Sequence, residues 1–227
     1  MFFNTKISKV GWYKENDMLI HPSLSIEPKM QNNFGCPSIS SMNNRIFNIY
    51  PQFSAKIMFG FKDNVPYYEY EIDKQMNTTQ FVHDLIKSRV YVRQEKDKVV
   101  LQITDDKLFV TNAKRLEMII FQPDIANYEN CYFVNGSFYP YGWIRSLNAA
   151  YVQINNKEQG IVHISSTQPY FNLLFSNKVS LKEITPNEEI LKYASNSIGM
   201  VNYHKNVKPV MERILKRRPK KFLFTLM

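Results

Sequence analysis

Short strand-like runs separated by turn residues fill most of this chain, and they outnumber helical patterns about five to one. In the run Tyr67–Asp73, tyrosines and an isoleucine alternate with acidic residues, which is the two-residue period of a strand with one face in water. The chain also contains 16 Phe and 14 Tyr residues, and aromatic side chains suit a pleated, half-buried surface. The sequence therefore predicts a mainly β fold with an antiparallel β-sandwich or barrel-like body.

The predicted strands are short runs rich in aromatic and β-branched residues. They are Arg45–Tyr50, Phe53–Phe61, Tyr67–Asp73, Val90–Arg93, Val99–Ile103, Leu108–Thr111, Leu116–Phe121, Ala150–Ile154, Ile161–Ile164, Tyr170–Phe175 and Val179–Ile184. The continuous apolar run Leu116–Phe121 predicts a central strand buried on both faces.

Turn residues predict how several of these strands are joined. Thr104–Lys107 is typical of a tight hairpin turn, and Asn135-Gly136 between aromatic residues favours a type I′ turn. Asn155–Gly160 predicts a third hairpin, and Ser176-Asn177 a further turn. The Pro- and Gly-punctuated stretch His21–Pro37 predicts an irregular loop.

Helical signals are few and lie mainly at the C-terminal end. Thr78 or Thr79 is a candidate cap for one internal helix that runs to about Ser88. A capping box at Thr185 predicts a helix over 186–193, and a narrow apolar stripe predicts another over 207–218. We therefore expect a β-rich body at 1–184 and a helical segment with a basic tail at 185–227.

Length and composition limit the class of protein. A chain of 227 residues with 44% hydrophobic residues can bury a large core, which excludes wholesale disorder. No run approaches the roughly 18 apolar residues of a membrane span, and the first residues do not form a signal peptide. Cys36 and Cys131 have no metal-type spacing, so we expect free thiols, although a disulfide between them stays open.

The positive charge is concentrated at one end. The segment 205–221 carries eight basic residues and one acid, so it holds +7 of the formal net charge of +9. The candidate partner- or polyanion-binding residues are Arg213, Lys216, Arg217, Arg218, Lys220 and Lys221. Their field would attract nucleic acid or an acidic protein surface, whereas the alternative is a solvated helix end. The apolar residues 222–226 would then dock on the body or on a partner.

Signatures of catalysis and metal binding are absent from the sequence. The histidines, His21, His83, His163 and His204, form no paired ligand motif, and seven glycines build neither a P-loop nor a dinucleotide fingerprint. We therefore expect no metal and no cofactor, although a dispersed active site stays open. The alternating Glu69, Glu71 and Asp73, like the turn formers Asp105 and Asp106, are expected on a solvated surface.

Aromatic residues cluster between Tyr132 and Trp143 around Asn135-Gly136. This cluster favours an aromatic core, and a surface that stacks bases or contacts a partner is the alternative.

Two stretches carry a resemblance to known proteins. Cys36-Pro37-Ser38-Ile39 with Phe47–Phe53, and Ala149–Phe175, resemble uncharacterised proteins of T4-like cyanophages and other marine phages. This resemblance implies a viral setting, in the cytoplasm of a host cell or associated with the virion.

A second stretch, Gly160–Ile164 with Pro169–Phe175, resembles the closing strands of the dUTPase and dCTP-deaminase fold. Thr167-Gln168 replaces the glycine usual in that turn, and the catalytic aspartate hairpin has no counterpart. The resemblance implies a β fold and does not extend to nucleotide hydrolysis.

Together these features favour a non-enzymatic, phage-type structural or protein-binding protein whose basic C-terminal segment contacts a protein partner or assembly. The first alternative is a nucleic-acid-binding accessory protein that acts through the same tail, and the second is an enzyme with a dispersed site.

Overall fold

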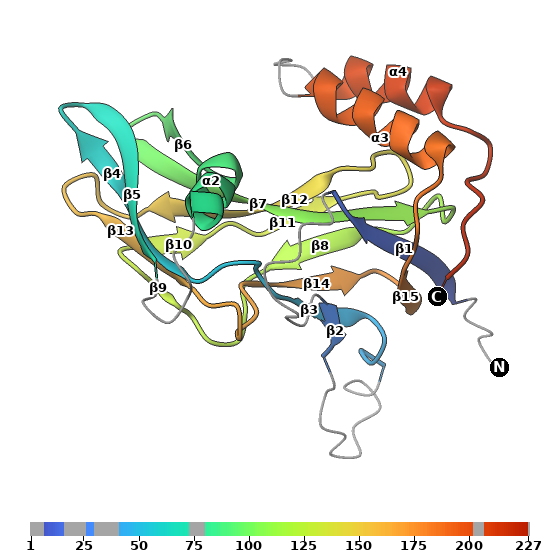
Figure 1. Cartoon of the computed structure of the whole chain (residues 1–227), viewed down its shortest axis with the longest axis horizontal. Coiled ribbons are helices and arrows are strands. Elements are labelled where there is room, and N and C mark those ends of the chain that lie inside the picture. Colours follow the sequence, from blue (N-terminus) through green and yellow to red (C-terminus); the bar gives the residue numbers. More distant parts are fainter. Residues whose placement is uncertain (1–6, 16–25, 30–40, 73–79, 202–206, 227) are drawn as a thin grey trace.

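The computed structural model describes residues 7–15, 26–29, 41–72, 80–201 and 207–226. These residues form three sheets and few helices, so the predicted mainly β fold is confirmed (Figure 1). All three sheets are open, so the body is sandwich-like and the barrel-like alternative is wrong. Several residues named in the sequence analysis lie outside the described residues: His21, Cys36, Asp73, Thr78, Thr79, His204 and Lys205.

The first sheet has six strands in the order β10-β12-β7-β1-β15, with β6 also paired to β7. Its strands are β10 (Cys131–Phe133), β12 (Ser146–Gln153), β7 (Lys98–Thr111), β1 (Ser8–Lys14), β15 (Val179–Glu183) and β6 (Val90–Glu95). Neighbours run antiparallel, except that β1 and β15 are parallel.

The other two sheets are antiparallel throughout their described strands. The second has the order β11 (Gly136–Phe138), β8 (Met118–Phe121), β14 (Phe171–Phe175), β3 (Ile46–Ile49), β2 (Ile26–Pro28). The third has the order β5 (Val65–Ile72), β4 (Ala55–Lys62), β13 (Gly160–Ile164), β9 (Tyr128–Glu129). Strand β2 lies inside the predicted loop His21–Pro37, so that prediction is wrong for Ile26–Pro28.

The three predicted hairpins and the Ser176-Asn177 turn illustrate how non-local pairing overrides local turn signals. Strand β10 ends before Asn135 and β11 begins at Gly136, and the two strands belong to different sheets. Neither Asn135 nor Gly136 adopts a positive φ. Strands β12 and β13 likewise separate into the first and third sheets, and β14 and β15 into the second and first. The hairpin predictions at Asn135-Gly136 and Asn155–Gly160 are therefore wrong, because the chain passes from one sheet to another at each of them.

The predicted hairpin turn Thr104–Lys107 lies inside the single continuous strand β7. Thr104 pairs with Asn148 and Leu108 with Ser146, so three residues of β7 stand opposite one residue of β12. This is a β-bulge, which lets consecutive side chains point to the same side of a strand. The hairpin prediction is wrong, and the bulge explains the turn-like composition of this stretch.

One edge of β7 is shared by two strands in succession. Strand β6 pairs with β7 from Lys98 to Ile103, and β1 pairs with it from Lys107 to Thr111. Strand β12 lies along the opposite edge. The bulge therefore sits where β7 changes its partner.

The described buried apolar residues form two clusters on opposite faces of β7. The first packs one face, with Leu101, Ile103 and Phe109, against the second and third sheets. The second covers Leu108 and Val110 on the other face with the C-terminal helices. Strand β8, by contrast, alternates buried and half-buried residues, so its predicted burial on both faces is wrong.

The helices are α2 (Gln80–Arg89), α3 (Glu188–Val201) and α4 (Val207–Arg217). The ranges of α2 and α4 are close to the predictions, whereas α3 extends eight residues beyond the predicted end at Tyr193. Helix α2 buries Val82 and Ile86 in the first cluster. Helices α3 and α4 lie together over the first sheet (Figure 1). The Asn187 side chain accepts the backbone N–H of Ile190 at 2.9 Å, so the described cap of α3 is Asn187, not Thr185.

Gly160 provides a test of how closely the Phe59 ring packs against the neighbouring strand of its own sheet. It stands opposite Phe59 in β4, and a Cβ at Gly160 would approach the buried Phe59 ring to 2.5 Å. We expect Gly160→Ala to destabilise the protein by about 1–3 kcal/mol, because the ring has to leave its place in the core. The matched control is Gly136→Ala, whose Cβ would meet nothing within 4 Å. Denaturant unfolding measures both, and equal stability of the two variants would contradict this packing.

Candidate functional site

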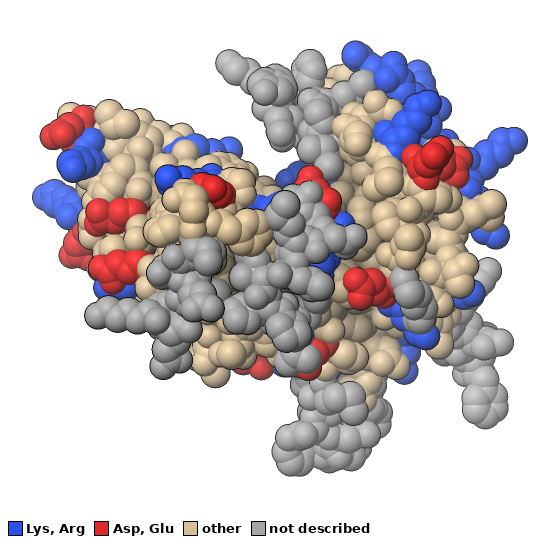
Figure 2. Space-filling model, in the orientation of Figure 1, with Lys and Arg blue, Asp and Glu red and all other residues tan. Residues whose placement is uncertain are grey.

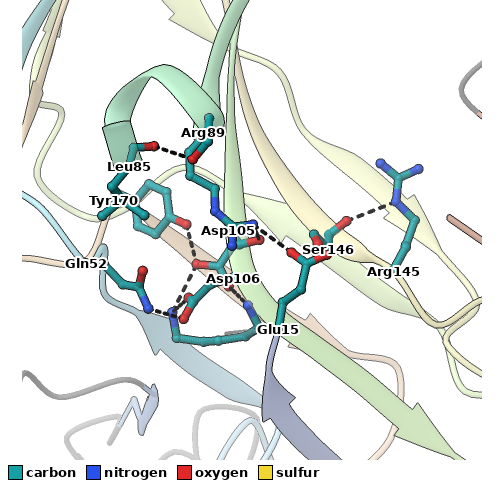
Figure 3. Close-up of polar contacts among 11 residues, drawn as sticks. Glu15, Gln52, Leu85, Arg89, Asp105, Asp106, Arg145, Ser146 and Tyr170 are labelled. Atoms are coloured by element: carbon teal, nitrogen blue, oxygen red, sulfur yellow. Dashed lines mark hydrogen bonds and ion pairs between the residues drawn. The ribbon is translucent and has the colours of Figure 1, made fainter. Parts of the chain in front are cut away.

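A buried charged cluster occupies the bulge of β7 (Figure 3). The Lys107 ammonium donates to Asp105 at 3.0 Å, to Asp106 at 2.9 Å and to the backbone carbonyl of Tyr50 at 3.1 Å. Tyr170 donates its hydroxyl to Asp105, and Gln52 donates its amide to Asp106. The exposed fractions of Asp105 and Asp106 are 3% each and that of Lys107 is 1%, so the expected solvated position of the two aspartates is wrong.

An ion pair closes the gap between the two strands that share the edge of β7. Arg89 directly precedes β6, Glu15 directly follows β1, and the Arg89 guanidinium donates to the Glu15 carboxylate at 2.8 Å. The Glu15 amide also donates to the Asp106 carbonyl at 2.8 Å. Side chains thus connect the sheet where the backbone ladder is interrupted.

The charged cluster has the chemistry of an active site without access for a substrate. Burial raises the pKa of the Asp105 carboxyl, and Lys107 opposes that rise. Burial lowers the pKa of Lys107, but the two carboxylates outweigh it and raise that pKa above its ordinary value. The adjoining cavity measures about 10 Å³, which is room for one water molecule at most. We therefore assign the cluster a structural role.

The predicted C-terminal site residues divide into exposed and buried ones. Arg213, Lys216, Arg217, Lys220 and Lys221 are exposed, and we call this set the cationic surface. None of the five forms an ion pair with another described residue. Figure 2 shows lysine and arginine gathered over the α4 end of the molecule.

Arg218, the sixth predicted residue, is an anchor of the C-terminal segment. Its guanidinium donates to the carbonyls of Tyr141 at 2.7 Å and Thr111 at 2.8 Å, and it lies 3.8 Å from the Tyr141 ring centroid. The next buried residue is Phe222. The side-chain amide of Asn112 donates to the Phe222 carbonyl and accepts from the Phe222 backbone N–H, both at 3.0 Å. The apolar end of the chain therefore docks on the body, and the expected exposure of Arg218 is wrong.

The other sequence candidates show ordinary structural surroundings. Glu69 and Glu71 are exposed, as expected. His83 hydrogen-bonds the Tyr70 hydroxyl at 2.9 Å, and Cys131 is a free, buried thiol. Among the described residues, no group of three or more His, Cys, Asp or Glu side chains is placed to hold a metal ion.

The predicted aromatic cluster is divided between core and surface. Phe133 packs edge-on against the buried Tyr151 ring in the first cluster, with ring centroids 5.3 Å apart. Tyr132 and Tyr139 are exposed, at 46% and 55%. This stretch thus contributes Phe133 to the core and Tyr132 and Tyr139 to the surface.

A hollow of about 550 Å³ opens on the half of the first sheet that α3 and α4 leave uncovered, on the same face that these helices cover elsewhere. We call it the outer hollow, and its main lining residues are Tyr91, Gln102, Thr104, Trp143, Arg145 and Asn148. These residues come from β6, β7, β12 and the segment before β12. Sequence reasoning missed it, because its members are up to 57 positions apart and no local pattern joins them.

A comparison with protein families, curated proteins and solved structures finds no match to this chain. Of the helices that the structure describes, none has the length and apolar character needed to cross a membrane.

Lys107→Met tests the structural role of the charged cluster. The variant leaves two buried carboxylates without their cation, so we expect it to lose about 3–5 kcal/mol of unfolding free energy at neutral pH. Without Lys107 the folded-state pKa of Asp105 rises further above its unfolded value, so the folded state binds the proton more tightly. Lowering the pH through that folded pKa therefore stabilises the folded variant, and the deficit should shrink as the pH falls.

Denaturant unfolding across a pH series measures this deficit, with exposed Lys157→Met as the control. A loss below about 1 kcal/mol, which is within the range of many single substitutions, would contradict the structural role.

Arg218→Gln and Lys221→Gln form a pair that separates anchor from surface. The first leaves buried carbonyls without a donor, for which we expect a loss of about 1–3 kcal/mol. The second changes an exposed residue and should stay within about 0.5 kcal/mol of the wild type. Thermal melts compare the two, and an equally small effect of both would show that Arg218 does not anchor the segment.

Proposed function

We propose that this protein is a non-enzymatic binding protein and that its cationic surface contacts nucleic acid. The observation that carries the proposal is a set of five exposed, unpaired cations on a segment that Arg218 and Phe222 fix to the body. Cations that lack carboxylate partners keep their full attraction for phosphate groups. Because the segment is already folded, binding does not require the ordering of a free tail.

The distribution of the charge favours contacts with the phosphate backbone over reading of base sequence. The five cations lie on α4 and just after it. Glu212 is the one acid among residues 207–226. Phosphate contacts position a nucleic acid without specifying its sequence. The proposed binding is therefore sequence-tolerant and depends strongly on salt.

A protein partner is the second candidate function, and a groove between α3 and α4 favours it. This groove of about 260 Å³ is lined by Tyr193, Ile214 and Pro219, with charged Glu189 and Arg217 also lining it. An apolar floor with a charged rim is the usual composition of a protein interface. The same experiment discriminates the two candidates, because a protein partner does not require affinity for nucleic acid.

The test is a salt titration of binding to labelled single-stranded and duplex oligonucleotides. If all five cations contact a duplex, log K should fall against log salt with a slope of about −4 to −5. Between 50 and 200 mM salt that slope weakens the affinity by roughly 500-fold. Replacing Arg213, Arg217, Lys220 and Lys221 by glutamine should remove most of the binding and reduce the slope by about 3 to 4.

The matched control removes four exposed lysines elsewhere in the molecule. It replaces Lys62, Lys87, Lys96 and Lys157 by glutamine, which changes the net charge by the same amount. We expect this control to bind the oligonucleotides much more tightly than the variant in which four residues of the cationic surface are replaced. An equal loss of nucleic-acid affinity in the two variants would show that only the net charge matters. No binding by the wild type at 50 mM salt would contradict the nucleic-acid proposal and favour the protein partner.

A further inference from the structure

The outer hollow lies on the half of the first sheet that α3 and α4 leave open. On the covered half, β7 presents Leu108 and Val110 to the helices. On the open half the same face presents Gln102 and Thr104 to the hollow. The polar residues thus begin where the covering helices end, and they surround a space within the usual 300–1,000 Å³ of small-molecule sites.

Arg145 is the centre of this hollow. Its Nε donates to the Ser146 carbonyl at 3.0 Å, and its guanidinium lies 4.3 Å from the Trp143 ring centroid. Figure 3 shows the guanidinium directed away from the charged cluster of β7. The side chain is thereby fixed at one end, and its fork points away from the sheet's charged interior.

Asn148 holds the Arg145 fork from one side. With its amide oxygen toward Arg145 and Tyr91, Asn148 accepts from the Arg145 Nη2 at 3.3 Å and from the Tyr91 hydroxyl at 3.2 Å. In this orientation its nitrogen donates to the Thr104 hydroxyl and to the Leu147 carbonyl, each at 3.1 Å. Both ends of the Asn148 amide and the hydroxyls of Tyr91 and Thr104 then have hydrogen-bond partners. The Arg145 guanidinium keeps N–H groups that have no partner among the described residues.

Arg145 has no carboxylate partner among the described residues. The segments that the structure does not describe contain two acids, Asp17 and Asp73. Burial lowers the pKa of Arg145, but an arginine stays charged at any physiological pH. A partly buried cation without a counter-ion is costly, and a bound anion would offset that cost.

The rest of the lining includes no acid, and the Gln102 amide is a further donor. Burial raises the pKa of Tyr91, although Arg145 and Arg93 lower it, so the phenol keeps its proton at neutral pH. The Trp143 Nε1 is buried without a hydrogen-bond partner among the described residues. Arg93, also in the lining, is paired with Glu95 at 3.2 Å, so Arg145 is the lining cation that has no carboxylate partner among the described residues.

We propose that the outer hollow binds a small phosphorylated molecule of about nucleotide size, with its phosphate on Arg145. A guanidinium fork matches phosphate oxygens in a bidentate geometry. The tetrahedral group has further oxygens for a donor such as the Gln102 amide. The remaining volume accommodates the sugar or nucleoside that carries the phosphate. This site is independent of the proposed nucleic-acid surface, because no residue of α4 lines it.

Titration with small probes, followed by tryptophan fluorescence and thermal melts, tests this site. The probes are adenosine 5′-monophosphate, ribose 5-phosphate, inorganic phosphate and adenosine. We expect the two phosphate esters to raise the melting temperature and to change the fluorescence, with inorganic phosphate weaker and adenosine without effect. The chain has two tryptophans, and Trp12 is 7% exposed in the first cluster, so the signal should come from Trp143.

Substitutions locate the phosphate. Arg145→Gln should weaken binding about tenfold to a hundredfold, which is the usual contribution of a charge-assisted bond, and Arg145→Lys less. Exposed Arg115→Gln is the control and should bind as the wild type does. Trp143→Phe should abolish the fluorescence response, which tests the position even if Arg145→Gln does not fold.

Three outcomes would overturn the proposal. The first is an equal response to adenosine and its monophosphate, and the second is wild-type affinity in Arg145→Gln. The third is no response to either phosphate ester at about 10 mM, a concentration above the dissociation constants of weak specific sites. A fluorescence response that survives in Trp143→Phe would also place the site elsewhere. The glutamine variant of the cationic surface should keep its affinity for the phosphate esters, which separates this site from the nucleic-acid surface.

Discussion

The ion pairs of Lys107 with Asp105 and Asp106 are the contacts on which the rest of the molecule depends. They lie in the bulge of β7, at the point where one edge of that strand passes from β6 to β1. Burying three charges is costly, and it is offset here because the ammonium and both carboxylates have hydrogen-bond partners. The cluster thereby fixes the register of β7, and with it the division of the first sheet into two halves.

The sequence predicted the local elements well and their partners poorly. The alternation in Tyr67–Asp73 and the stripe of α4 depend on nearby residues, so their patterns are visible without the fold. Whether Asn135-Gly136 closes a hairpin depends on β12 and β8, which are distant in the chain and pair with the strands on either side. The Asp105 carboxylate accepts the Lys107 amide at 2.8 Å, a contact typical of turns, so the bulge had the same local signature as a hairpin.

The candidate sites differ in predictability for the same reason. A run of basic residues is visible in any sequence, so the cationic surface was found, but its anchor Arg218 was not distinguished from its neighbours. That distinction comes from Tyr141 and Thr111, which are 77 and 107 positions away. The outer hollow combines Tyr91, Thr104 and Arg145 through the register of three strands, and register is a property of the whole sheet.

The C-terminal helices therefore determine where the first sheet can bind a ligand. Their apolar residues, among them Ile190, Val210 and Ile214, are buried with Leu108 and Val110 of β7, so they depend on the body for their core. A longer helical cover would reach Gln102 and Thr104, whose polar groups an apolar helix face leaves unsatisfied. Because α3 and α4 cover only half of the face, its apolar half is buried, and its polar half with Arg145 stays open to small molecules from solution.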